Sequence, residues 1–334
     1  MRKIVIDVFG ADYPEKLIRG VAAASREFTD VTLVVPGEES ILRPALLEAE
    51  AVMERIELLP ASEVITNLDA PADAILKKRN SSLVVGIRAL KEDEEAVGMI
   101  SAGNTGAVLV GAALRLGRLP GVTFPALASV FTSPEGRPVI MLDCGANVDV
   151  KPEAMVIFAH LGSALISSLG VESPRVALLS VGVEDKKGNA LTHAVFPMLK
   201  ESSLNFVGNM EACDMLSGKY DVVVCDGFDG NVVIKSLEGA AKLALSEMVK
   251  ALGAVGVDRE KINAALAKAL PSFDYTSGGG GVLLGVAKPI VKAHGAANEK
   301  TVPATVRQLL SYTNGDFIAR QRAAVSDIAN TENK

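Results

Sequence analysis

The stretch DVVVCDGFDGNVVIK, residues 221–235, indicates how this chain folds. Its uninterrupted run of valines predicts a β-strand that is buried on both faces, as in a parallel sheet. Small and polar residues follow at once, from Asp226 to Asn231, and a second apolar run comes after them. In parallel sheets, ligands bind beyond the carboxyl ends of the strands. The polar segment is therefore expected to form a loop at a binding site.

The same pattern recurs along most of the chain. Short apolar runs predict strands at residues 3–8, 31–36, 55–60, 96–101, 139–144, 175–182, 204–208 and 221–226. Segments with helical period lie between most of them, at residues 14–27, 40–53, 71–78, 84–93, 105–117, 153–169 and 189–200. This alternation predicts a doubly wound α/β fold, with a mostly parallel sheet and helices on both faces in an α/β/α sandwich.

The last third of the chain is more helical. Helices are expected at 238–252, at 259–270 with Pro271 ending it, and from about 301 to 325, while the glycine-rich segment 274–285 is expected to be a loop. No linker marks a domain boundary. We expect one catalytic α/β domain over residues 1–334, with two lobes around a cleft and a helical protrusion at approximately 238–272.

Composition limits the classes of function. Hydrophobic residues make up 49% of the 334 positions and charged residues 22%, which is typical of a soluble globular protein. The formal net charge of -6 argues against nucleic acid as a partner. The three cysteines, Cys144, Cys213 and Cys225, are widely spaced without a CxxC pair, which favours a reducing compartment and no structural zinc. No apolar run is long enough to span a membrane, so a cytoplasmic location is expected.

Four predicted strand ends, at 100–107, 142–149, 179–189 and 224–231, combine glycine with asparagine, aspartate or lysine. Glycine lets the backbone approach a ligand, and asparagine donates hydrogen bonds without charge. We expect these segments to surround one shared pocket, although the same residues also form ordinary turns. The candidate phosphate- or substrate-binding residues are Ser101, Gly103, Asn104, Thr105, Gly106, Asp143, Asn147, Asn189, Asp226, Gly230 and His294.

Several of these residues allow a structural role as well. Residues 101–106 lead into an apolar helix, whose free N–H groups suit an anion, but Asn104 or Thr105 can equally cap that helix. The lysines in 185–189 can neutralise phosphate and stabilise an oxyanion, or form a solvated pair. Asp226 and Asp229 can bind a metal, act as bases or form a turn.

Other chemistry is less favoured by the sequence. Cys225, inside a valine run, is more typical of a small buried residue than of a nucleophile. His294 is a better active-site candidate than His160 or His193, which fall in helical segments. The segment GGGVLLG at 279–285 matches a dinucleotide fingerprint only loosely, so it is weak evidence for NAD. The three histidines are too scattered to suggest zinc.

Seven motifs resemble, in the same order, those of the phosphate acyltransferase family of bacterial phospholipid synthesis (PlsX). They are SAGNTGA (101–107), LDCGANVDVKPE (142–153), EDKKGN (184–189), FVGNMEACD (206–214), DVVVCDGFDGNVVIKSLEG (221–239), the GG-x-x-LLG segment (279–285) and KAHG (292–295). The resemblance implies a fold similar to isocitrate and isopropylmalate dehydrogenases. It also implies transfer of a long-chain acyl group from acyl carrier protein to inorganic phosphate, without NAD or metal, by a homodimer associated with the inner face of the membrane.

The resemblance also implies site residues. The functional lysine of the KGN motif falls on Lys187, and the asparagine of the GFxGN motif falls on Asn231. We expect Lys187 to neutralise phosphate and Asn231 to donate to the thioester carbonyl oxygen. The chain departs from the family at DVFGAD (7–12), where DAMGGD is usual, at Phe124, where arginine is usual, and at Ala296 and Ala297, where serines are usual.

Some alternatives stay open. The apolar helices at 238–270 can pair across a dimer, lie on lipid or pack within the protein. The fold also hosts dehydrogenases and acetyl- or butyryltransferases that use coenzyme A thioesters. A scaffold that only binds acyl carrier protein is the non-enzymatic alternative.

Overall fold

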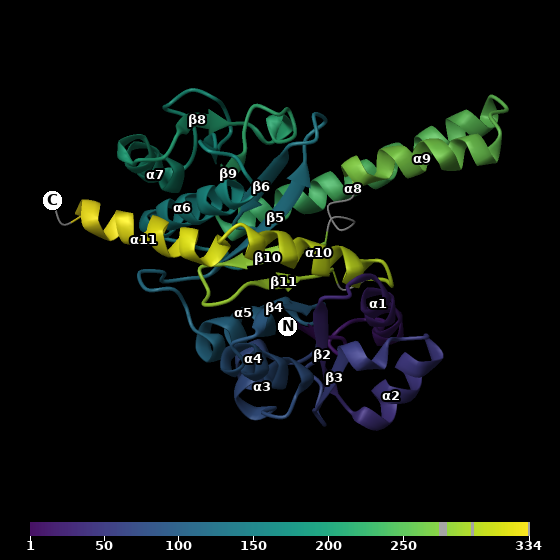
Figure 1. The fold of residues 1–334 in the computed structure, drawn as a ribbon. Coiled ribbons are helices and arrows are strands. Elements are labelled where there is room, and N and C mark those ends of the chain that lie inside the picture. The colour runs from purple at the N-terminus through teal and green to yellow at the C-terminus, as the bar shows by residue number, and fades with distance from the viewer. Residues whose placement is uncertain (274–278, 295–296, 333–334) are drawn as a thin grey trace.

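In the computed structural model of the chain, residues 1–273, 279–294 and 297–332 are described (Figure 1). Within these ranges one sheet of eleven strands has the order β3-β2-β1-β4-β11-β10-β5-β6-β9-β7-β8. The strands are β1 (Arg2–Asp7), β2 (Val31–Gly37), β3 (Ile56–Pro60), β4 (Ala96–Ser101), β5 (Ala126–Thr132), β6 (Pro138–Leu142), β7 (Val176–Leu179), β8 (Phe206–Met210), β9 (Val222–Val224), β10 (Gly281–Leu284) and β11 (Ile290–Lys292).

Helices cover the sheet, which confirms the predicted α/β fold class. They are α1 (Pro14–Glu27), α2 (Glu39–Glu48), α3 (Pro71–Lys77), α4 (Ser82–Glu92), α5 (Thr105–Gly111), α6 (Pro152–Ser168), α7 (Ala190–Glu201), α8 (Gly227–Ala254), α9 (Arg259–Phe273), α10 (Thr301–Asn314) and α11 (Phe317–Glu332). A π-helical segment, Ala112–Leu116, extends α5.

The sheet consists of two parallel blocks that run in opposite directions. The first block holds β3, β2, β1, β4 and β11, parallel to one another, and the second holds β6, β9, β7 and β8, also parallel to one another. Between the blocks, β10 is antiparallel to both β11 and β5, and β5 is antiparallel to β6. The hairpin of β10 and β11, from late in the chain, therefore joins two blocks that come from earlier residues.

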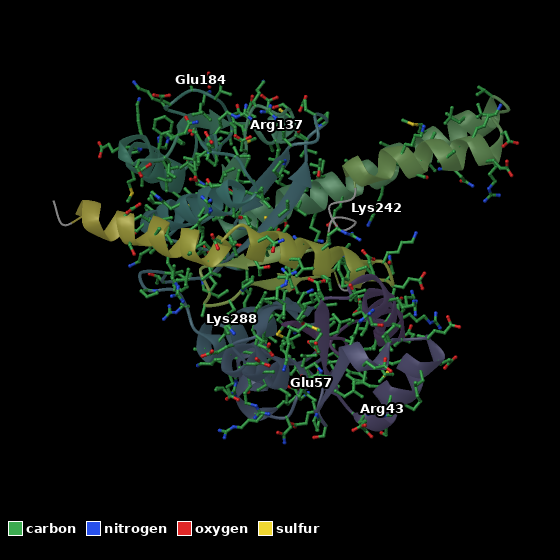
Figure 2. All side chains as sticks on the ribbon, in the orientation of Figure 1. Arg43, Glu57, Arg137, Glu184, Lys242 and Lys288 are labelled. Atoms are coloured by element: carbon green, nitrogen blue, oxygen red, sulfur yellow. The ribbon has the colours of Figure 1, made fainter. Side chains whose placement is uncertain are left out.

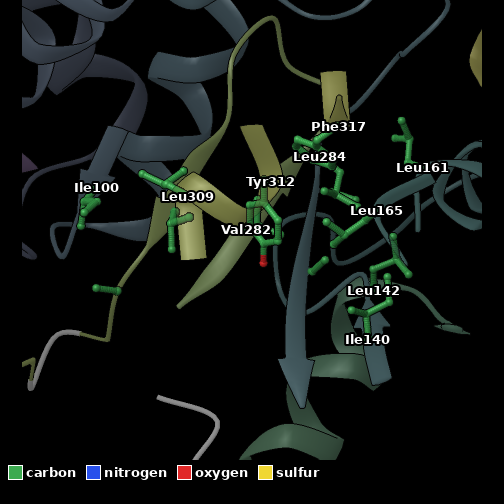
Figure 3. Close-up of a cluster of buried hydrophobic side chains, with 14 of the residues drawn as sticks. Ile100, Ile140, Leu142, Leu161, Leu165, Val282, Leu284, Leu309, Tyr312 and Phe317 are labelled. Carbon is green, nitrogen blue, oxygen red and sulfur yellow. The ribbon is translucent and has the colours of Figure 1, made fainter. Parts of the chain in front are cut away.

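One hydrophobic core extends across this junction. Figure 3 shows Ile100 of β4, Val282 and Leu284 of β10, and Ile140 and Leu142 of β6 in a single buried cluster. Leu161 and Leu165 of α6 complete it on one side, with Leu309, Tyr312 and Phe317 from the C-terminal helices. Because these side chains come from both blocks, burial of the core holds the blocks together.

The last third differs from the sequence prediction in three places. Residues 227–231 are not a loop but the first turn of α8, because the Asp226 side chain caps this helix by accepting from the Asp229 N–H at 2.8 Å. Helix α9 continues past Pro271 to Phe273. The C-terminal helix is divided into α10 and α11 at Gly315 and Asp316, where the φ of Asp316 is 53°.

Helices α8 and α9 extend away from the body of the molecule as a pair (Figure 1). Leu243, Met248 and Val255 on this pair are exposed by 65%, 56% and 77%. None of the helices in the described ranges combines the length and apolar character needed to cross a membrane. The division into one domain with two lobes remains a prediction.

Candidate functional site

A cavity of about 380 Å³ lies where strand ends of the two blocks meet near the β10–β11 hairpin. Its walls come from the start of α5, from β5, from the turn after β6, from α8 and from β10 and β11. The lining residues are Thr105, Leu127, Ser129, Cys144, Gly145, Asn231, Ile234, Lys235, Gly280, Gly281, Lys292, Ala293 and His294.

Asn231 stands on the α8 side of this cavity. It lies in the first turn of the helix, and its side chain packs against Gly145, where an added Cβ would come within 3.5 Å of Asn231 Cγ. The φ of Gly145 is 108°, a conformation that favours glycine. Lys235 follows one turn later and pairs with Glu238 at 3.1 Å. The helix therefore presents an uncharged donor and a cation to the same space.

Lys292 and His294 come from the end of β11. Lys292 pairs in register with Ser101 of β4 and Gly281 of β10, so its backbone is fixed on both sides. Burial lowers the pKa of the Lys292 ammonium to about 8, although the charges of Asp12 and Asp7 oppose the shift. Partial burial also lowers the pKa of His294, and the charge of Lys235 lowers it further.

A buried carboxylate supports the β1 and β4 ends beside Lys292. Asp7 is fully buried and accepts from the hydroxyls of Ser82 at 2.7 Å and Ser101 at 2.8 Å. Burial raises the pKa of Asp7, and these hydroxyl bonds counter the shift. The Gly103 N–H donates in turn to Ser101 Oγ. Ser101 and Gly103 thus act on the framework behind the cavity and do not line it.

Asp143 has the corresponding role in the other block. Its carboxylate accepts from the backbone N–H groups of Leu127, Ala146 and Asn147, and from Asn147 Nδ2. Burial raises its pKa, while these bonds act in the opposite direction. Asn147 also accepts from the Gly227 N–H at 2.8 Å, which ties the turn after β6 to the start of α8. This network places Gly145 against Asn231.

The other predicted residues near the site cap helices or allow close packing, and they do not line the cavity. Asn104 caps α5 by accepting from the Ala107 N–H at 3.1 Å, and Gly106 lies against Pro71 of α3. Asp226 caps α8, and partial burial raises its pKa. Gly230 packs on the Asp143 carbonyl, where an added Cβ would lie only 1.9 Å from the oxygen.

Lys187 and Asn189 lie outside the cavity lining. Both are exposed on the segment after β7, and Asn189 caps α7 through a reciprocal pair of bonds with Thr192. Figure 2 shows Glu184, which begins the EDKKGN motif, near β8 and well separated from Lys242 on α8. The structure therefore brings together Thr105, Asn231 and His294 among the predicted residues, supported by the two carboxylate networks.

Three features singled out in the sequence take the following positions. The GGGVLLG segment contains strand β10 and not a strand-to-helix turn, so the loose match to a dinucleotide fingerprint lacks the structure that such a site needs. Phe124 is 47% exposed and Ala297 is buried, and neither lines the cavity. Ala296, like residues 274–278 of the expected loop, lies outside the described residues.

Two lysines of the cavity, Lys235 and Lys292, were missed as site residues. Lys235 lies four residues after Asn231, a spacing that puts both on one helix face. The prediction of a loop at 226–231 hides that signal, because a loop has no helix face. Lys292 belongs to the KAHG motif, from which only His294 was selected. A larger cavity of about 870 Å³ between α1, α2 and α10 contains none of the predicted residues.

Comparisons with known proteins agree with the motifs. A family model described as fatty acid synthesis protein matches residues 2–320. A phosphate acyltransferase from Brevibacillus brevis is 42% identical over 307 residues, which cover 90% of this chain and 90% of the relative. A phosphate acyltransferase from Caldanaerobacter subterraneus is 40% identical over 322 residues, which cover 95% of each chain.

Solved structures share the fold at low identity. A phosphotransacetylase from Streptococcus pyogenes has a TM-score of 0.63 at 14% identity, covering 95% of this chain and 94% of that one. A 4-hydroxythreonine-4-phosphate dehydrogenase from Salmonella typhimurium has a TM-score of 0.53 at 12% identity, covering 93% and 99%. These similarities concern the fold alone. From the family model and the relatives of about 40% identity, the chain belongs to the fatty acid synthesis protein family, the phosphate acyltransferases that its motifs resemble.

Proposed function

We propose that this protein transfers a fatty acyl group from acyl carrier protein to inorganic phosphate, giving acyl phosphate for phospholipid synthesis. Family membership supports the reaction class. The observation that carries the proposal is the cavity in which Asn231, Lys235 and Lys292 face the same space. An uncharged donor beside two cations suits the meeting of an anionic nucleophile with a carbonyl that develops negative charge.

The reaction needs little acid–base chemistry. A phosphate oxygen attacks the thioester carbonyl carbon, and the carbonyl electron pair moves onto oxygen as the new C–O bond forms. The intermediate collapses when the electron pair on oxygen re-forms the C=O bond and the C–S bond breaks. The carrier thiolate leaves with the C–S bonding pair and takes a proton from solvent. The side-chain amide of Asn231 donates to the carbonyl oxygen as charge develops, and the lysines offset the charge of phosphate.

From the family resemblance, Lys187 is proposed as a catalytic residue. Because Lys187 lies outside the cavity lining, its role in turnover needs a direct test. Strand β7 is the hydrogen-bonded neighbour of β9, so the segment carrying Lys187 begins at the same sheet edge as α8. Lys187 itself is exposed and away from the cavity lining. If it acts on phosphate, Lys187→Ala lowers turnover, whereas its exposed neighbour Lys186→Ala keeps wild-type turnover.

The decisive experiment supplies long-chain acyl carrier protein and phosphate and traps acyl phosphate as a hydroxamate. We expect hydroxamate only when protein, carrier thioester and phosphate are all present. A parallel reaction with acetyl and butyryl coenzyme A separates this function from that of a short-chain transferase. Product from coenzyme A thioesters alone, or from neither donor, would refute the proposal.

The assembly and location are proposed with the reaction. The exposed apolar side chains on α8 support a homodimer formed through this helix pair. A cytoplasmic location is proposed with it. The same region, residues 238–270, supports peripheral contact with the inner face of the membrane.

Flotation with anionic liposomes tests the proposed membrane contact: Leu266→Glu, in a protein with unchanged oligomeric state, should abolish flotation. Wild-type flotation of that variant would exclude lipid contact at Leu266.

A further inference from the structure

Lys292 differs from Lys235, which also lines the cavity, in how its charge is held. Within the described ranges it forms no ion pair with a carboxylate, and its ammonium donates to the Ala293 carbonyl beside it. The nearest buried carboxylate, Asp7, already accepts from the hydroxyls of Ser82 and Ser101. Lys235, in contrast, is more exposed and pairs with Glu238 at 3.1 Å.

The fold fixes the backbone of Lys292 beside the cavity. Lys292 ends β11, and the backbone of β4 on one side and β10 on the other pairs with it in register. The Ala293 N–H then donates to the Ser101 carbonyl at 2.9 Å, which extends the pairing past the lysine. A cation on a paired central strand is better positioned than one on an exposed loop, because its backbone cannot move independently.

We infer that Lys292 is a phosphate-binding residue and holds the attacking phosphate in the cavity between α8 and the β10–β11 hairpin. The inference rests on the proposed function. It assigns Lys292 a role in phosphate binding that is separate from the roles proposed for Lys187 and Asn231. An anion bound at Lys292 lies in the cavity that Asn231 also lines, so the nucleophile and the carbonyl donor are brought together. Phosphate in turn supplies the direct ionic contact that the ammonium does not make with a carboxylate of the described residues.

Protonation of Lys292 then controls phosphate binding. Burial lowers its pKa to about 8; Asp12 and Asp7 favour the charged form, and Lys235 disfavours it. His294 adjoins the same space, and partial burial lowers its pKa as well. Because only the ammonium attracts an anion, phosphate affinity should fall as pH rises through about 8 in the free protein. Bound phosphate favours the protonated form, so binding takes up protons above that pH.

The test measures binding of inorganic phosphate alone by isothermal titration calorimetry, without an acyl donor, across roughly pH 7.5 to 9.5. We expect Lys292→Met to weaken binding about tenfold or more, since a charge-assisted contact is lost. Lys292→Arg should bind phosphate with little loss of affinity as pH rises, because guanidinium stays protonated. The matched control is Lys288→Met, since burial also lowers the Lys288 pKa but its ammonium bonds to the Asp93 and Ala96 carbonyls outside the cavity.

Each outcome has a distinct meaning. Weak binding in Lys292→Met together with normal binding in Lys288→Met supports the inference. Wild-type affinity in Lys292→Met, equal losses in both methionine variants, or the same pH dependence in wild type and Lys292→Arg overturns it. If phosphate binds as expected but no acyl hydroxamate forms, the proposed function fails while the inference stands. If Lys292→Met makes acyl phosphate with an unchanged KM for phosphate, the inference fails while the function stands.

Discussion

At the scale of single residues, the site combines one uncharged donor with cations of different character. The backbone of Asn231 belongs to the first turn of α8, and its side chain lies beside Gly145 in the turn after β6 that Asp143 holds. This arrangement resembles the preorganised donors that stabilise oxyanions, in which geometry is set before the reaction begins.

Asn231→Ala should lower kcat for acyl phosphate formation by about 100- to 1,000-fold, the loss typical of removing one oxyanion donor. The KM for phosphate should change little, because the amide acts on the carbonyl. Val232→Ala, an exposed neighbour on the same helix, serves as the control in steady-state assays. Comparable kcat in both variants would remove Asn231 from the mechanism.

His160 provides a pH prediction unconnected with catalysis. It is 6% exposed in α6, and burial lowers its pKa to about 4. The unfolded state, with a pKa near 6.5, binds more protons, so the free energy of unfolding falls as pH drops from about 6.5 to 4. This group alone should cost about 3 kcal/mol over that window.

Urea denaturation at several pH values measures the effect. His160→Gln should reduce the slope of stability against pH in that window, whereas the exposed His193→Gln should keep the wild-type slope. An unchanged slope in His160→Gln would assign the acid sensitivity to carboxylates instead.

Residue identity predicted part of the site. The sequence pattern predicts Thr105 and His294, the family resemblance adds Asn231, and all three line the cavity. Lys292 was not selected, because a lysine after a short apolar run is usually solvated, and the sequence does not show that two other strands enclose it. The networks around Asp7 and Asp143 depend on hydroxyl and amide groups distant in sequence, so no local pattern reveals them.

At the scale of elements, the start of α8 is the most informative difference between prediction and structure. Glycine and aspartate at 226–230 are typical of turns, and the sequence favoured a loop. The structure uses the same residues as a cap and as a close contact: the Asp226 side chain caps the helix, and Gly230 lets it approach the Asp143 carbonyl. Tertiary packing has overridden local propensity here.

Gly230→Ala should therefore destabilise the protein by about 1–3 kcal/mol, because a Cβ would overlap the Asp143 carbonyl oxygen and the backbone must move. Gly239→Ala on the same helix has open space at its Cβ and should stabilise by about 0.5–1 kcal/mol. The free energy of unfolding in urea measures both. A neutral Gly230→Ala would mean that α8 can shift away from the turn after β6.

The helix pair α8 and α9 provides a prediction about assembly. If the pair forms a dimer contact, Leu243→Glu combined with Met248→Glu should convert the protein to a monomer, because two buried charges would face an apolar partner. Light scattering coupled to size exclusion measures the change. Lys250→Glu, on the same helix at a position already exposed and paired with Glu247, should leave the assembly intact.

Short strands also escaped prediction. Strands β10 and β11 have only four and three residues, and a glycine run precedes the first. Such segments acquire strand geometry from their neighbours and not from their own propensity. Strand β5 contains Ser129 and alanines, so it lacks the continuous apolar pattern of the others. The sequence prediction therefore lacks β5, β10 and β11, which lie at the centre of the sheet.

At the scale of the whole molecule, the fold class followed from the alternation of strands and helices, but the polarity of the sheet did not. A doubly wound arrangement predicts that the carboxyl ends of all parallel strands lie at one edge of the sheet. Here the two parallel blocks run in opposite directions, because β10 is antiparallel to β11 and to β5, and β5 is antiparallel to β6. The cavity forms where they meet, so segments after β4, β6, β9 and β11 contribute to it while the segment after β7 does not. Strand direction depends on long-range pairing, which a single sequence does not display.

The order in which these pairings become available has a consequence for synthesis on the ribosome. Residues 281–292 supply the two strands that join β4 to β5, so a nascent chain that has emerged only as far as α9 exposes both of those strands as open edges. Unpaired edges of apolar strands invite association with other chains. Occupancy by a holding chaperone should accordingly peak late in translation and end when the hairpin closes the gap.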